Sequence, residues 1–104
     1  MAKMNSKNLD IEKTSRMLKA VSDPDRLRLV LQLKDGRKNV STLANALGAE
    51  IVNISHHLGV LRGTKVVKDE KIGRFVYYTL NPDVISVEGG SIHFQMGGCK
   101  LVIG

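Results

Sequence analysis

The hydrophobic pattern of this chain changes at Gly63–Thr64, and that change limits the folds open to it. Before this point, apolar residues recur every three or four positions, which is typical of amphipathic helices. After it, apolar and polar residues alternate, which is typical of half-buried strands. A chain of helices followed by antiparallel hairpins is predicted to adopt a mainly helical α+β fold.

Local signals divide the helical part into segments. Residues 9–21 are predicted to form a first helix. Asp23 can cap a second helix, which Gly36 ends. Ser41 is expected to cap a third helix over residues 42–47.

The stretch from Gly48 to Arg62 has the most informative pattern. At 3.6 residues per turn, Ile54, Leu58 and Leu61 form one narrow apolar stripe. The opposite side is short, polar and nearly uncharged, and it consists of Val52, Asn53, Ser55, His56 and Gly59. Such a surface suits the edges of DNA bases in a major groove. An ordinary solvent-exposed helix is the alternative.

A hairpin is predicted directly after this helix. Residues 66–70 and 74–80 read as paired strands with a connection at residues 71–73. A helix-turn-helix followed by such a hairpin predicts a winged helix-turn-helix. Lys71 and Arg74 lie at the tip, where they can contact phosphates or a minor groove. Ordinary hairpin-tip charges are the alternative.

A second hairpin is predicted at the end of the sequence. The Gly97–Gly98 pair lies between two alternating runs, which is a hairpin signal that also fixes the register. Six apolar side chains then share one face, with Met96 opposite Cys99, Phe94 opposite Leu101 and Ile92 opposite Ile103.

The chain is therefore expected to have three parts. Residues 1–8 form a flexible N-terminus, and residues 9–83 form the winged helix-turn-helix. Residues 84–104 form a C-terminal β-hairpin extension that packs on its own domain or on a second copy.

Composition favours a polyanionic partner. The 104 residues have a formal net charge of +6 and a pI near 9.7. There is one cysteine, no apolar run of membrane length and no apolar segment of a secretory signal near Met1, so a cytoplasmic setting is expected.

Three motifs together resemble the ArsR/SmtB family of bacterial winged-helix repressors. They are AVSDPDRLRL at residues 20–29, ISHHLGVLR at 54–62 and GRFVYYTL at 73–80. The resemblance covers roughly residues 10–83. It implies a homodimeric transcriptional regulator that binds double-stranded operator DNA, usually a repressor released by a signal.

The resemblance also implies which residues contact DNA. By position they are Ser41, Thr42, Val52, Asn53, Ser55, His56, Arg62, Lys71 and Arg74. Chemistry suggests individual roles: Asn53 can pair with adenine, His56 can donate to guanine or phosphate, and Val52 can contact a thymine methyl group. Ser55 suits a phosphate. For each of the four, an ordinary solvent-facing position is the alternative.

The sequence departs from metal-sensing members of the family. Residues 40–47 contain no Cys or His, and the adjacent His56 and His57 diverge by about 100° around a helix. His93 and Cys99 would lie on opposite faces of the tail hairpin. We therefore expect no bound metal or other cofactor, since no set of three or four ligands is evident. His57 is interpreted as a packed, hydrogen-bonded residue.

Two further departures concern the tail. Many family members end in a helix that pairs with the first helix at the dimer interface, and the β-hairpin is hypothesised to replace it. Cys99 is interpreted as a structural residue, with a thiol sensor as the alternative.

The main alternative function is a winged-helix protein-docking or assembly module that does not bind DNA. An enzyme is not expected, because the sequence shows no Ser/His/Asp arrangement and no phosphate loop.

Overall fold

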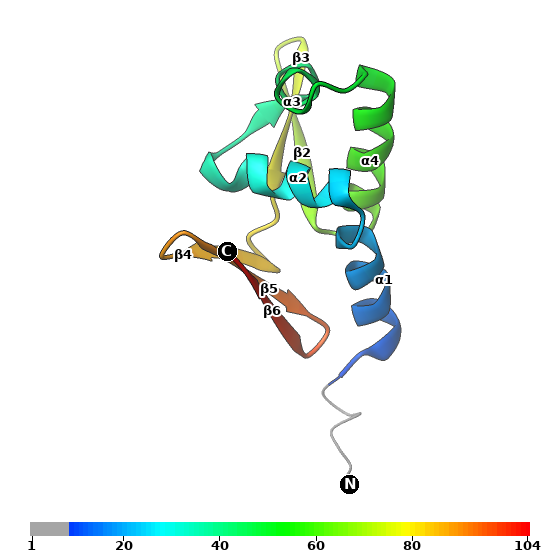
Figure 1. Ribbon diagram of the computed structural model, residues 1–104, viewed down its shortest axis with the longest axis vertical. Coiled ribbons are helices and arrows are strands. Elements are labelled where there is room, and N and C mark those ends of the chain that lie inside the picture. The colour runs from blue at the N-terminus through cyan, green and yellow to red at the C-terminus, as the bar shows by residue number, and fades with distance from the viewer. Residues whose placement is uncertain (1–8) are drawn as a thin grey trace, which may run out of the picture.

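The computed structural model describes residues 9–104 (Figure 1). The helices are α1 (Ile11–Val21), α2 (Pro24–Gln32), the short 3₁₀ helix η1 (Leu33–Asp35), α3 (Val40–Leu47) and α4 (Ile51–Gly63). The strands are β1 (Lys38–Asn39), β2 (Val67–Ile72), β3 (Phe75–Leu80), β4 (Ile85–Glu88), β5 (Ser91–Met96) and β6 (Cys99–Ile103). The winged helix-turn-helix and the α+β class are confirmed, while the predicted flexibility of residues 1–8 lies outside the described residues. None of the described helices is long and apolar enough to cross a membrane.

Side-chain caps start the helices of the N-terminal half. The Asp23 carboxylate accepts hydrogen bonds from the backbone N–H groups of Asp25 and Arg26, as predicted. The cap of α3 was predicted wrongly: Asn39 caps it by accepting from Thr42 N, and Ser41 lies inside the first turn. Asn39 is also the last residue of β1, so the strand ends and the helix begins at the same residue.

A single apolar cluster holds the helices together. Ile54, Leu58 and Leu61 of α4 are completely buried, as their spacing predicts. They pack in the same cluster as Leu29 and Leu43 of the two preceding helices. Burial of this stripe fixes the rotation of α4 about its axis, and therefore decides which side chains face solvent.

The first sheet has the strand order β1-β3-β2, and β2 and β3 form the wing. The predicted connection at residues 71–73 is wrong: the turn is Gly73–Arg74, with Ile72 directly opposite Phe75. Gly73 has a φ of +64°, which suits the first position of a tight hairpin turn. Lys71 is consequently a strand residue, opposite Val76.

The second sheet is larger than predicted. The register of β5 and β6 is confirmed, with Ile92 opposite Ile103, Phe94 opposite Leu101 and Met96 opposite Cys99. The additional strand, β4, was not predicted; it pairs with β5 through the Gly89–Gly90 turn and makes the tail a three-stranded sheet rather than a hairpin. Ile92, Phe94 and Met96 are buried in the same cluster as the helices.

The β5–β6 turn contacts the start of α1 (Figure 1). Thr14 Oγ1 donates to Met96 O at 2.6 Å, and Asp10 N donates to Gly97 O at 2.7 Å. Gly97 has a φ of +58°, and a Cβ there would lie 2.6 Å from Thr14 Oγ1. The tail sheet therefore packs on α1 of its own chain through a contact that has no room for a side chain.

The tail sheet buries a residue of α1 that the apolar pattern does not include. The pattern places Ile11, Leu18 and Val21 on one face, with Met17 and Ala20 beside it. Val21, Met17 and Ala20 are buried in the core cluster, whereas Ile11 and Leu18 are 63% and 40% exposed. Thr14 is buried as well, because it faces the β5–β6 turn.

Candidate nucleic-acid interface

The polar side of α4 stands free of the fold. Val52 is 74% exposed, and Asn53, Ser55 and His56 are exposed beside it. Charged groups are few on this side, so its hydrogen-bonding groups are amide, hydroxyl and imidazole. Such a face can approach base edges without first breaking ion pairs.

The helix before α4 braces it. Gly48 ends α3 in a left-handed conformation, and Ala49 N donates to Ala44 O across the turn. The predicted contact residues Ser41 and Thr42 are both exposed at the start of α3. Their hydroxyl groups are therefore accessible to a phosphate, as a bracing helix requires.

The wing provides the cationic part of the surface. Lys71 and Arg74 are exposed, Arg74 in the turn and Lys71 on the adjoining strand. Arg37, which was not among the predicted contact residues, adds to it: its guanidinium lies 5.1 Å from the centroid of the Tyr77 ring. The signal for it was present in the basic Arg37–Lys38 pair of the connector.

Arg62 differs from the other predicted contact residues because it already has a partner. Its Nη1 lies 3.0 Å from Asp69 Oδ2, although its side chain remains 55% exposed. The ion pair joins the last turn of α4 to β2 of the wing.

The structure thus exposes every one of the predicted contact residues. The turn of the wing, α3 and the first turns of α4 lie at one end of the molecule, and the tail sheet lies at the other (Figure 1). A rigid duplex could meet the first three elements together.

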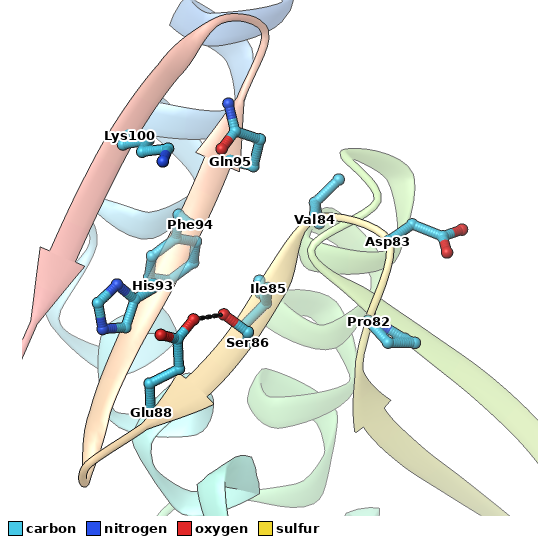
Figure 2. Close-up of a pocket in the computed structure, with 10 residues that line it drawn as sticks. All are labelled: Pro82, Asp83, Val84, Ile85, Ser86, Glu88, His93, Phe94, Gln95 and Lys100. Atoms are coloured by element: carbon cyan, nitrogen blue, oxygen red, sulfur yellow. Dashed lines mark hydrogen bonds between the residues drawn. The ribbon is translucent and has the colours of Figure 1, made fainter.

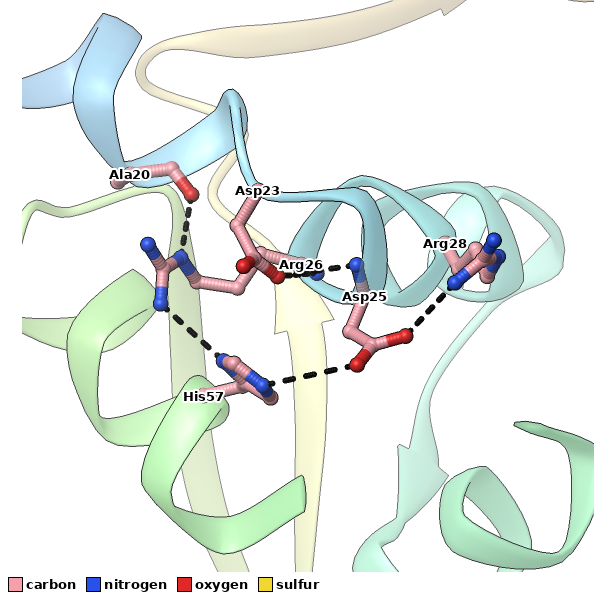
Figure 3. A network of polar contacts seen from close by, with 6 residues as sticks. All are labelled: Ala20, Asp23, Asp25, Arg26, Arg28 and His57. Atoms are coloured by element: carbon pink, nitrogen blue, oxygen red, sulfur yellow. Dashed lines mark hydrogen bonds and ion pairs between the residues drawn. The ribbon is translucent and has the colours of Figure 1, made fainter. Parts of the chain in front are cut away.

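His57 lies at the edge of the core in a polar network (Figure 3). Arg26 Nη1 is 3.1 Å from His57 Nδ1, and Arg26 Nε donates to Ala20 O at 2.7 Å. Because a guanidinium only donates, His57 Nδ1 must accept, which places the ring proton on Nε2. Nε2 lies 3.9 Å from Asp25 Oδ2. His57 is therefore packed and hydrogen-bonded, as predicted.

The expectation that the chain contains no set of three potential metal ligands is wrong, because this network contains one. One potential ligand atom from each of Asp23, Asp25 and His57 lies within 4.8 Å of the others. These groups already have partners, however. Asp23 caps α2, Asp25 pairs with Arg28 at 2.7 Å, and His57 accepts from Arg26. A cation there would also meet the positive charge of Arg26.

The network shifts one ionisation. The pKa of Asp23 is lowered, chiefly because its carboxylate accepts the backbone N–H of Arg26, and the positive charge of Arg26 adds to this effect. Asp23 is consequently held as a carboxylate, the form that caps α2.

Two features lie away from this surface. A hollow of about 190 Å³ covers the outer face of the tail sheet, where Ser86 Oγ donates to Glu88 and His93 and Lys100 complete a polar lining (Figure 2). Cys99, the free thiol of the tail, is half-buried and packs against the core. Neither feature shares residues with the predicted contact surface.

Comparison with known proteins gives consistent matches. A family model described as "Bacterial regulatory protein, arsR family" matches residues 23–69. The transcriptional repressor SdpR of Bacillus subtilis is 35% identical over 71 residues, which are 68% of this chain and 79% of SdpR. The HTH-type transcriptional regulator NmtR of Mycobacterium tuberculosis is 40% identical over 63 residues, and the match covers 61% of this chain and 52% of NmtR, about half of its length.

A solved structure shows the same fold. It is the solution structure of the homodimeric winged helix-turn-helix DNA-binding domain of a possible ArsR-family transcriptional regulator from Mycobacterium bovis. The two share 25% identity with a TM-score of 0.69, over 80% of this chain and 78% of the other.

Proposed function

Because the chain belongs to the ArsR family of bacterial regulatory proteins, we propose that it is a homodimeric repressor that binds operator DNA through α4. The matched relatives are regulators of transcription, and the expectation that the chain is not an enzyme agrees with this membership.

The exposed polar face of α4 is the observation on which the proposal depends. Val52, Asn53 and His56 project from a helix whose opposite stripe is fully buried, so their direction is fixed by the core. Asn53 is assigned to an adenine edge, His56 to guanine or a phosphate, and Val52 to a thymine methyl group.

The surrounding residues are assigned to the DNA backbone. Ser41, Thr42 and Ser55 offer hydroxyl groups, and Arg62, Lys71 and Arg74 offer positive charge. Phosphate contacts of this kind position a protein without reading sequence, and they make its affinity depend on salt.

The exposed face of α1 is assigned to the dimer contact. Leu9, Ile11 and Leu18 line an open apolar groove of about 450 Å³. Two chains joined across this face by a two-fold axis would present two α4 helices to one side of a duplex. Successive major grooves about one helical turn apart would then accept them.

We further propose that the Asp23–Asp25–His57 group is a structural network and not a metal sensor. Its carboxylates and imidazole are engaged with a helix N-terminus and two arginines. Addition of Zn²⁺ or Co²⁺ at micromolar concentration should leave DNA affinity unchanged. A metal-dependent change in affinity that Asp25→Asn abolishes would show that the network is a sensor.

A binding-site selection tests the main proposal. The full-length chain is incubated with a pool of random-sequence duplexes, and the recovered duplex is titrated at several salt concentrations against a scrambled duplex of equal composition. We expect enrichment of an imperfect palindrome, bound tightly and with an affinity that falls as salt rises. Recovery of no preferred sequence, with weak binding throughout, would instead favour a protein-docking winged helix.

A further inference from the structure

The wing ends in an apolar pair, Ile72 and Phe75, to which the proposed function assigns no role. Phe75 is 50% exposed and Ile72 is 36% exposed, and they lie directly opposite each other on the last rung before the Gly73–Arg74 turn. Of the four Phe and Tyr side chains, Phe94 is buried, Tyr77 and Tyr78 are half-buried, and Phe75 is exposed. Leaving a ring in water forgoes the stabilisation that burial would give.

The strand register shows which way this pair faces. Asp69, Lys71 and Val76 share the face of the wing that turns toward α4, since Asp69 pairs with Arg62. Phe75 and Ile72 occupy the opposite face, and no other described residue covers them fully. The turn that joins β2 and β3, next to this pair in sequence, lies at the same end of the molecule as the start of α4 (Figure 1).

The groups around the pair favour a polyanion as its partner. Arg74 lies next to Phe75 in the turn, the Phe75 and Tyr77 ring centroids are 6.4 Å apart, and Arg37 lies over Tyr77. Glu70, opposite Tyr77, is the one carboxylate on this face of the two wing strands. An apolar tip with Arg74 beside it in sequence and Arg37 over the neighbouring Tyr77 ring would be a poor contact for an apolar protein surface. It suits a DNA minor groove, where cations meet the backbone and apolar side chains enter between base pairs.

We propose that Phe75, supported by Ile72, is a wedge that enters the minor groove beside the α4 contact and bends the operator. The favoured partner is a flexible pyrimidine–purine step, TA or CA, because such steps unstack most easily. Phe75 would then contribute to specificity without a hydrogen bond to any base. This inference rests on the proposed DNA binding and adds to it a DNA deformation and a sequence preference.

The test compares two exposed residues of the same strand. Phe75→Ala removes the wedge, while Val76→Ala removes a side chain that is 36% exposed on the opposite face. The probe is the duplex recovered by selection, labelled at its two ends for resonance energy transfer. Circular dichroism confirms that each variant is folded.

We expect the wild-type chain and Val76→Ala to bring the duplex ends closer together and Phe75→Ala to do so much less. Phe75→Ala should also lose about tenfold in affinity, and a mismatch placed at the wing-proximal step should restore most of it because unstacking is then already achieved. Phe75→Leu, which keeps apolar bulk, should retain more of the bend than Phe75→Ala.

Three results would overturn the inference. Phe75→Ala could bend and bind DNA as the wild type does. Alternatively, Val76→Ala could lose as much bending and affinity as Phe75→Ala. Phe75→Ala could also change the sedimentation of the free protein, which would make a second copy the partner of this tip. In all three cases the wild type still binds DNA, whereas a wild-type chain that selects no duplex would overturn the proposed function as well.

Discussion

Arg62 Nη1 lies 3.0 Å from Asp69 Oδ2, so the end of α4 is tied to the first strand of the wing. The side chain of Arg62 is 55% exposed and that of Asp69 is 35% exposed. Exposed ion pairs contribute little to stability, about 1 kcal/mol or less. Its importance is positional, because it occupies an arginine that the proposed interface would use for phosphate.

Asp69→Asn should therefore strengthen DNA binding. The substitution frees Arg62 for the phosphate contact proposed for it and removes the negative charge beside this arginine, so affinity should rise severalfold while the free energy of unfolding changes by about 1 kcal/mol or less. Glu88→Gln is the matched control, since it removes an equal charge from β4 of the tail sheet, at the other end of the molecule from the wing turn. Anisotropy titrations with both variants provide the measurement. Equal gains in DNA affinity from the two variants would mean that net charge alone, and not the release of Arg62, determines the effect.

Leu18→Asn should weaken the dimer. Leu18 is 40% exposed on the α1 groove, and Leu31 on α2 is 42% exposed outside that groove. Burial of Leu18 against a second copy would make its replacement cost about 1–3 kcal/mol in association, whereas Leu31→Asn should have little effect. Sedimentation velocity over a range of protein concentrations measures both. A dimer that loses stability only with Leu31→Asn would place the interface elsewhere.

Gly97→Ala should destabilise the fold. Its Cβ would lie 2.6 Å from Thr14 Oγ1 and 2.9 Å from Asp10 O, so the tail sheet would have to move off α1. Gly89 has nearly the same φ, +57° against +58°, and nothing within 4 Å of an added Cβ. Both variants carry the cost of a left-handed backbone, about 1 kcal/mol, and the steric cost falls on Gly97→Ala alone. If urea unfolding shows that Gly97→Ala and Gly89→Ala lose the same free energy of unfolding, the close packing of Gly97 on α1 is ruled out.

Part of the tail sheet could be predicted from the sequence and part could not. The β5–β6 register follows from the Gly97–Gly98 turn, because a two-residue loop allows one pairing and alternation then fixes the faces. The same signal is present at Gly89–Gly90, but no hairpin was predicted there and β4 was missed. Four residues of β4 give too short a pattern to indicate a strand without its partner.

Other features depend on contacts that local pattern does not contain. Ile11 and Leu18 look like core residues on a helical wheel, but they remain exposed, and Thr14 is buried because the β5–β6 turn packs on it. The contact surface was easier to predict. Ile54, Leu58 and Leu61 define the buried stripe of α4, and the exposed face follows by exclusion. Phe75 was not singled out because an aromatic residue in a strand pattern is ordinarily buried.

Stability should fall in acid partly through Asp23. Its pKa is lowered in the folded chain from an ordinary value of 3.8, so its contribution is present above about pH 4 and is lost as pH falls through the folded value. Asp23→Asn keeps a capping oxygen but does not titrate. In urea unfolding at pH 7, 5 and 3, the wild type should be the more stable at pH 7, and the difference should shrink at pH 3. A difference that stays constant with pH would contradict the charged cap.

The most direct test of the whole account is an anisotropy titration of Asn53→Ala and wild type against the selected duplex and its single-base variants. We predict a loss of roughly 1–3 kcal/mol for Asn53→Ala, with preference relaxed at one base position and unchanged at the others. Wild-type affinity and unchanged base preferences in Asn53→Ala would show that this face of α4 does not read DNA.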